Sequence, residues 1–257
     1  MLFDKNSYVA HPPKLFLLRD RLCLEAIAYS MDSISASLEF IQCLTAKYSD
    51  AEFGPSFSEQ ELRALCSDVW NVVDQLHMLR KLLEQLDPQR AGIPGEFAKK
   101  YGVATEIRNK MDHLHQNLDN LANAKSGRST IFGSLSYVAN PRFEEEEGSR
   151  VFKGKIVTQP FGDLTHAIHS MGSVNPSGKP VPLNEKTGLF EFMAFGLTLP
   201  IYTLTNDLKT LAAILENGAK NIAKNVVEEA KARGENTEGA LDQSPVVAFS
   251  MDFSSRA

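Results

Sequence analysis

The chain has 257 residues, of which 43% are hydrophobic and 23% charged, and its net charge is −5. An apolar fraction of this size is that of a globular protein, so the composition excludes a chain that is mainly disordered. The 27 basic and 32 acidic residues also exclude an overall positive field, so any contact with nucleic acid or anionic lipid must be local. The length fits one large domain or two small ones.

Several features indicate a cytoplasmic protein without a membrane segment. The three cysteines have no Cys-x-x-Cys spacing, so they fit neither a disulfide framework nor a zinc knuckle. The N-terminal sequence has an acidic residue at Asp4 and lacks the apolar core of a signal peptide. The most apolar uncharged run, 192–206, contains Gly196 and Pro200 and is shorter than the ~20 residues that span a bilayer.

Four segments repeat apolar residues at steps of three and four, which places these residues on one face of an α-helix. Their apolar positions are Leu24, Ile27, Met31, Ile34, Leu38 and Ile41; Leu62, Leu65, Val69, Val72, Leu76, Leu79, Leu83 and Leu86; Ile107, Met111, Leu114, Leu118 and Leu121; and Ile201, Leu204, Leu208, Leu211 and Leu215. Ser58 and Glu61 have the spacing of a capping box at the start of the second helix. Because four apolar stripes can bury one another, we predict a mainly α chain with an antiparallel four-helix bundle.

Between the third and fourth helices the apolar period changes to two. Ile131, Leu135 and Tyr137 alternate with serines, and 151–158 and 189–199 are two further strand candidates. We therefore predict a small antiparallel β-sheet inserted between the third and fourth long helices. The expected organisation is the first three helices in 1–127, a β-rich subdomain in 128–199, the final helix in 200–233 and a flexible tail in 234–257.

The third helix, expected over 103–124, has an unusual polar face. It offers Asn109, His113, Gln116 and Asn120, spaced by four, three and four residues, where an exposed helix normally presents Glu, Lys and Arg. Asparagine is a weak helix former, so something other than helix stability favours these residues. Two explanations stay open: the stripe is solvated, or it is buried against another surface such as a second copy of the chain.

The same helix contains a short motif, Arg108-Asn109-Lys110-Met111-Asp112-His113, and His115 lengthens the interval from Arg108 to six residues. This arrangement resembles the Arg-x4-6-His motif of HEPN-domain proteins. The resemblance implies a helical bundle with the motif on a late helix, and a metal-independent RNase of toxin or antiviral defence type. It implies catalytic roles for Arg108, Asn109, His113 and His115, with no metal or cofactor. The inserted sheet and the acidic net charge depart from the family pattern and leave substrate and activity open.

The residue types in this motif suit RNA cleavage by the ribose 2′-hydroxyl. Histidine transfers protons near neutral pH, and the planar guanidinium of Arg108 binds phosphate oxygens in pairs. On one straight helix, Arg108 and His113 are about 140° apart around the axis, whereas Arg108 and His115 nearly eclipse. A homodimer through the third helix would bring two copies of the motif together.

The charge near the start of the third helix is locally positive. Four basic residues stand against Glu106, a surplus that could hold a few phosphates: Lys99, Lys100, Arg108 and Lys110. RNA is therefore the expected partner of this segment.

Two alternative predictions assign the chain a function other than RNA cleavage. The first is a non-catalytic helical interaction or scaffold module that uses the Asn/Gln/His stripe as an interface. The second is a metal site in which His166 and His169 join His113 and His115, with Asp112 or Asp163, although no recognised metal-binding spacing is met.

Overall fold

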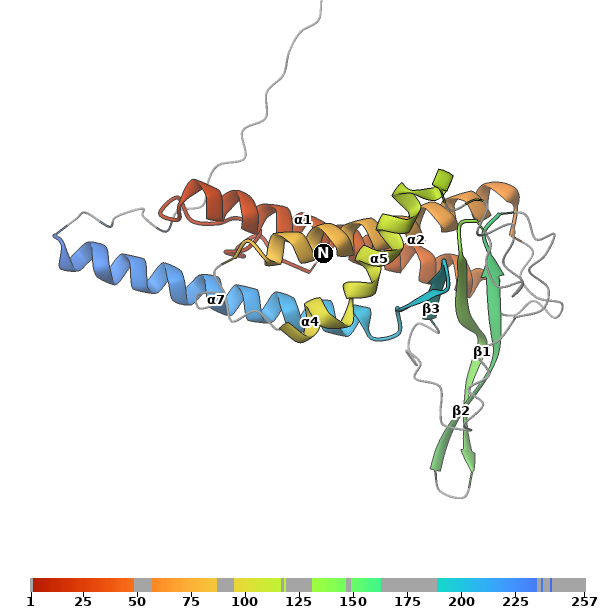
Figure 1. Ribbon diagram of the computed structural model, residues 1–257. Helices are drawn as coiled ribbons and strands as arrows, with labels where there is room; N and C mark the ends of the chain where they lie inside the picture. Colours follow the sequence, from red (N-terminus) through yellow and green to blue (C-terminus); the bar gives the residue numbers. More distant parts are fainter. Residues whose placement is uncertain are drawn as a thin grey trace, which may run out of the picture.

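The computed structural model describes residues 2–48, 57–86, 95–116, 118, 131–146, 149–162, 189–234, 237 and 241; the side chains of 138–156 and 189–190 are not described. Its helices are α1 (Leu18–Lys47), α2 (Glu59–Leu83), α4 (Gly95–Lys100), α5 (Gly102–Asp112) and α7 (Leu204–Ala232). Its strands are β1 (Ser134–Glu146), β2 (Ser149–Pro160), β3 (Leu189–Ala194) and β4 (Leu197–Pro200). Figure 1 shows the helices lying lengthwise, with the sheet at one end. The prediction of a mainly helical chain with a small antiparallel sheet is confirmed.

Helices α1 and α2 form an antiparallel pair along most of their length (Figure 1). The apolar stripes predicted for both helices are buried, apart from the partly exposed Leu62 at the start of α2. Polar contacts flank the buried stripe: Ser37 Oγ donates to Asp68, and Asn71 Nδ2 donates to Ser33 and Ser37. The periodic apolar pattern therefore predicted both helices and the face that each one buries.

The capping box at the start of α2 is present. The backbone N–H of Glu61 donates to Ser58 Oγ at 3.3 Å, and the Ser58 N–H donates to the Glu61 carboxylate at 2.9 Å. The same carboxylate also accepts from Lys47 Nζ at 2.8 Å and from the Tyr48 hydroxyl. The Lys47 ammonium, followed by Ser58 and Tyr48, lowers the pKa of Glu61 to about 2. This carboxylate joins the beginning of α2 to the end of α1.

We expect Ser58→Ala to destabilise the fold by about 1 kcal/mol, because the first N–H groups of α2 lose their side-chain acceptor. Urea unfolding followed by circular dichroism measures this difference. Ser67→Ala, at an exposed position inside the same helix, is the matched control and should leave the free energy of unfolding unchanged or slightly raise it. Equal losses in both variants would contradict the role of the cap.

The sheet has the strand order β2-β1-β3-β4, and each neighbouring pair is antiparallel. The strand candidates at 131–137 and 151–158 lie in or next to β1 and β2. The candidate at 189–199 is instead two strands, because the chain turns back at Phe195 and Gly196, whose φ angles are 53° and 74°. Beyond its pairing with β3, β1 continues with β2 as a two-stranded hairpin that extends away from the helices (Figure 1).

Aromatic side chains fix the sheet to α2. The Trp70 indole lies edge-on to Phe192 of β3, with ring centroids 5.5 Å apart, and its Nε1 donates to the Phe132 carbonyl. Phe192 and Leu135 are fully buried and belong to the same hydrophobic core as the helices. The sheet and the helices therefore share one core.

The predicted third helix differs from the observed one. Helix α5 ends at Asp112, and His113 adopts a non-helical turn conformation before one further turn at 114–116. The residues around this break, among them His113 and His115, are weak helix formers, so little intrinsic preference continues the helix. Residues 119–130, which include Leu121 and Asn120, lie outside the described part of the chain. The structure does not confirm a regular four-helix bundle.

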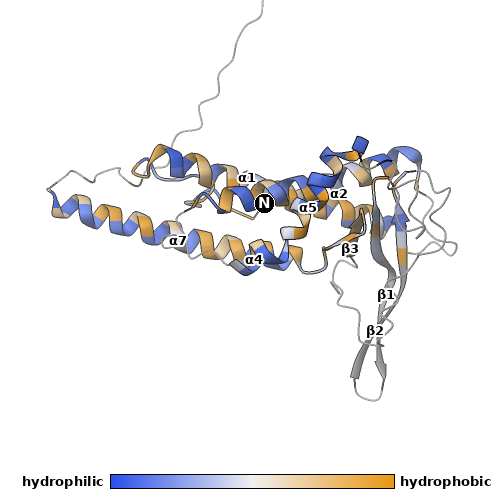
Figure 2. Ribbon diagram, in the orientation of Figure 1, coloured by the Kyte–Doolittle hydropathy of each residue, from blue (hydrophilic) through white to orange (hydrophobic). Residues whose placement is uncertain are grey.

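Helix α7 runs antiparallel to α1 (Figure 1), and polar and apolar residues alternate around it as in an amphipathic helix (Figure 2). Its apolar face joins the common core through Leu204, Leu208, Leu211 and Leu215. Within the residues that the structure describes, none of the helices combines the length and the apolar character needed to cross a bilayer.

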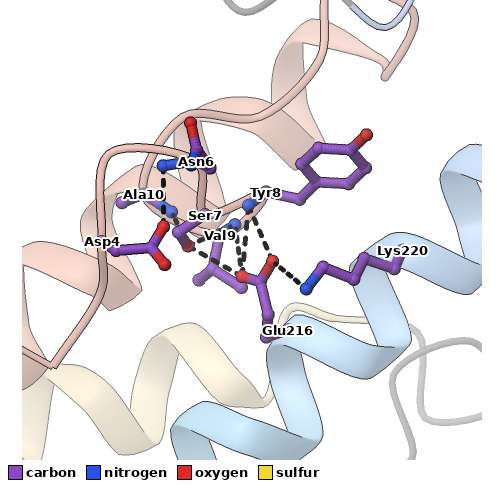
Figure 3. Close-up of polar contacts among 8 residues, drawn as sticks. All are labelled: Asp4, Asn6, Ser7, Tyr8, Val9, Ala10, Glu216 and Lys220. Atoms are coloured by element: carbon purple, nitrogen blue, oxygen red, sulfur yellow. Dashed lines mark hydrogen bonds and ion pairs between the residues drawn. The ribbon is translucent and has the colours of Figure 1, made fainter.

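The segment before α1 connects α1 to α7. The Leu2 N–H donates to Asp32 of α1 at 2.6 Å. On the other side, the Glu216 carboxylate of α7 accepts from the Ser7 hydroxyl at 2.8 Å and from the N–H groups of Tyr8 and Val9 (Figure 3). The segment 2–10 is thus part of the packed structure.

Candidate functional site

The motif helix α5 packs against α2. Ala104 and Ile107 of α5 are fully buried, and the opposite face of the helix is exposed. Two polar contacts join the helices, one between Asp74 and Arg108 and one between His77 and Thr105. Asp74 precedes His77 on α2, whereas its partner Arg108 follows Thr105 on α5, so the two helices run in opposite directions. His77 therefore lies diagonally across from Arg108.

Arg108 is held by two carboxylates. Its Nε atom lies 2.5 Å from an Asp74 carboxylate oxygen, and its Nη1 atom contacts Asp112, one turn later on α5. The Arg108 side chain is 31% exposed, and both aspartates are 50% exposed. The guanidinium is therefore fixed between α2 and the end of α5, with solvent at the edge of the ion pairs.

His77 lies beside this cluster. Its Nδ1 atom is 3.2 Å from the Thr105 hydroxyl, which also accepts a hydrogen bond from Arg80 Nη1 at 3.3 Å. Partial burial, followed by the nearby charges of Lys81 and Arg108, lowers the pKa of the imidazole below its ordinary value. His77 is therefore uncharged at neutral pH, next to the guanidinium of the motif.

The other motif residues are exposed. Asn109, His113 and His115 all lie on the surface, and so does Gln116 of the predicted polar stripe. His113 follows the last residue of α5, and its N–H donates to the Asn109 carbonyl at 3.2 Å. The straight-helix expectations, about 140° between Arg108 and His113 and near eclipse of Arg108 and His115, therefore do not apply. Since the structure contains one chain, solvation of the stripe and its burial against a second copy both stay open.

The basic residues predicted to give a local positive charge at the start of the third helix make separate contacts. Lys100 Nζ lies 2.6 Å from Asp207 of α7, which also accepts from the Tyr101 hydroxyl. Burial would raise the pKa of Asp207, but hydrogen bonds from Lys100, Tyr101 and Thr203 lower it overall. Lys110 Nζ donates to the Phe195 carbonyl at 3.3 Å. Lys100 thus connects α4 to α7 and is not grouped with Arg108.

Three cavities lie elsewhere on the molecule. One, of about 600 Å³, is lined mainly by apolar residues of α7 together with the start of α1 and the end of α2. The others lie between the N-terminal segment and α7, and between α4 and α7. None of these three is lined by Arg108, His113 or His115. Asn109, His113 and His115 are exposed, and Arg108 is partly exposed.

The structure does not describe all the residues of the alternative metal site. His166, His169 and Asp163 lie outside the described residues. Within the part of the chain that is described, no group of three or more His, Cys, Asp and Glu side chains is arranged to hold a metal ion.

Sequence reasoning did not identify the α2 residues that contact α5 near Arg108, namely Asp74, His77 and Arg80. They lie beside the apolar stripe of α2, next to Val73, which is also buried but falls outside the predicted stripe. Adjacent apolar residues at 72 and 73 widen the stripe, and this signal could have indicated a second helix packed on that side of α2.

Comparisons with known proteins give no family assignment. The sequence matches no protein-family model and no curated protein, and the chain matches no solved structure.

Proposed function

We propose that this chain is a HEPN-like, metal-independent endoribonuclease of toxin or defence type, acting in the cytoplasm as a homodimer. The observation that supports it best is the arrangement at the end of α5. Arg108 is anchored by α2, Asn109 beside it in the sequence is exposed, and so are His113 and His115 just beyond the end of α5. A permanent positive charge and two exposed proton-transfer groups within eight residues of chain support a site for RNA cleavage.

In the proposed reaction, Arg108 binds the non-bridging oxygens of the scissile phosphate and Asn109 orients it. One histidine, His113 or His115, accepts the proton of the ribose 2′-hydroxyl, and the 2′-oxygen attacks phosphorus. The bond from phosphorus to the 5′-oxygen breaks, and a second, protonated histidine gives its proton to that oxygen. The products are a 2′,3′-cyclic phosphate and a 5′-hydroxyl.

The proposed dimer forms through the motif helix, within a bundle related to that of HEPN proteins. The exposed polar side chains of Asn109, His113 and Gln116 supply the surface for a second copy. In such a dimer the base and the acid can come from different copies, so the motif of one chain is completed by the other.

We expect Arg108→Ala and His113→Ala each to reduce the rate of RNA cleavage by about 100-fold or more, since each removes a charge or proton-transfer group from the transition state. The measurement is cleavage of a labelled single-stranded RNA in the presence of EDTA. His11→Ala, a histidine in the N-terminal segment, is the control and should cleave at the wild-type rate. Wild-type rates in both motif variants would rule out the assigned residues.

A second function is favoured by one observation, the pairing of Arg108 with Asp74 and Asp112. Such pairing also suits a purely structural arginine in a non-catalytic interaction module. In that case, alanine substitution of Arg108 would lower the thermal stability, and the wild-type chain would leave RNA intact.

A further inference from the structure

We infer that Asp74 and Asp112 occupy donors of Arg108 that phosphate oxygens use when RNA binds, so that RNA must displace at least one of them. The inference depends on the proposed role of Arg108 as the phosphate-binding group. It concerns the regulation of that site: in the free chain the site is closed by two of the protein's own carboxylates.

The inference rests on the contacts that the Arg108 guanidinium makes. A guanidinium presents its donors in a flat fork, and two neighbouring donors bind either a carboxylate or a phosphate in the same way. Asp74 takes the Nε donor and Asp112 takes the Nη1 donor. A guanidinium binds an anion in pairs along its Nε–Nη2 edge or its Nη1–Nη2 edge, and each of these edges already has one donor engaged by an aspartate. A phosphate on either edge would compete with the aspartate there.

Because both aspartates are exposed to solvent, displacing their carboxylates from Arg108 costs little free energy. Each side chain is 50% exposed, so a carboxylate that leaves Arg108 is solvated rather than left as a buried, unpaired charge. Exposed ion pairs of this kind contribute little free energy each. The pairs are therefore strong enough to weaken RNA binding and weak enough to be replaced.

The neighbouring cations are also paired with carboxylates. Arg80 Nε lies 3.4 Å from Glu84, and Lys81 Nζ lies 3.7 Å from the same residue. His77 is uncharged at neutral pH for the reasons given above. The α2 side of the site consequently presents little net positive charge in the free chain, which agrees with the acidic composition of the whole protein.

Displacement of Asp112 from Arg108 also affects the neighbouring proton-transfer residue, His113. Asp112 is the last residue of α5 and directly precedes His113, at the point where the helix ends. When phosphate replaces Asp112 on Arg108, the constraint on this helix end is released next to His113. Phosphate binding and the position of His113 are thereby coupled.

The test uses Asp74→Asn and Asp112→Asn, which keep the shape of each side chain and remove its charge. Binding is measured by fluorescence anisotropy with a labelled 2′-O-methyl RNA, which lacks the attacking hydroxyl and stays intact. We expect each variant to bind about 2–5-fold more tightly than wild type, and the double variant about 10-fold more tightly. Arg108→Ala in the double variant should abolish the gain.

Glu96→Gln/Glu106→Gln is the matched control, because it removes two exposed negative charges from α4 and α5 without touching Arg108. Its gain should stay below about 1.5-fold in physiological salt, since neither carboxylate is paired with Arg108 and exposed charges are screened. If the aspartate variants gain no more than this control, the inference is wrong. If Arg108→Ala still weakens wild-type binding in that case, the proposed RNA site stands without the closure. If Arg108→Ala has no effect on binding, the proposed site and the inference both fail.

Discussion

Gly133→Ala is expected to destabilise the protein by about 2–5 kcal/mol, through backbone strain and a clash. Gly133 has φ +80° and directly precedes β1. A Cβ atom there would lie 2.5 Å from the Met193 carbonyl oxygen and 2.7 Å from the Phe192 ring. Both neighbours belong to β3, and Phe192 packs on Trp70. The substitution therefore forces β1 away from β3 at the place where the sheet meets α2.

Gly196→Ala separates the two causes of this loss. Gly196 has nearly the same backbone conformation, φ +74°, but a Cβ atom at this position meets nothing within 4 Å. It should lose only about 1–2 kcal/mol, the cost of the left-handed conformation for an L-residue. Urea unfolding monitored by Trp70 fluorescence gives both values. Equal losses at the two glycines would show that the close contact with β3 has no energetic weight.

Glu216→Ala is expected to destabilise the protein by about 2–4 kcal/mol, because hydrogen bonds to a charged group are lost and the Tyr8 N–H and the Ser7 hydroxyl lose their acceptor. The carboxylate receives the Ser7 hydroxyl and the N–H groups of Tyr8 and Val9, and it also pairs with Lys220 (Figure 3). Its side chain is only 18% exposed. Without it, the N-terminal segment should detach from α7 and become sensitive to protease.

Glu228→Ala is the control on the same helix. Glu228 is 65% exposed and pairs only loosely with Lys224 at 4.0 Å, so its removal should change stability by less than about 0.5 kcal/mol. Limited proteolysis followed by mass spectrometry locates the cleavage. An N-terminal segment that stays protected in Glu216→Ala would show that its apolar contacts alone hold it in place.

The parts of the fold that the sequence predicts are those set by local pattern. The apolar stripes of α1, α2 and α7 repeat at helical spacing, and the capping box at Ser58 involves two residues three apart. The alternation before Tyr137 predicted β1 for the same reason. Each of these features depends on neighbours within a few residues, so the local sequence alone is enough to predict it.

Contacts between distant segments could not be predicted in this way. Ser7 and Glu216 are 209 residues apart, and nothing in either segment marks the other as its partner. The partner of Arg108 on α2, Asp74, is an ordinary acidic residue on a helix surface until α5 is placed against it. The end of α5 at Asp112 was also missed, because the apolar spacing continues through Leu114 and Leu118 beyond the break.

In the proposed function, the surface formed by Arg108 and the end of α5 cleaves RNA by attack of the 2′-hydroxyl. The most direct measurement is the identity of the new ends after the purified chain is incubated with RNA in EDTA. We expect a 2′,3′-cyclic phosphate and a 5′-hydroxyl, and no product from RNA that carries 2′-O-methyl groups. Intact RNA, or ends with a 3′-hydroxyl and a 5′-phosphate, would contradict the proposed function.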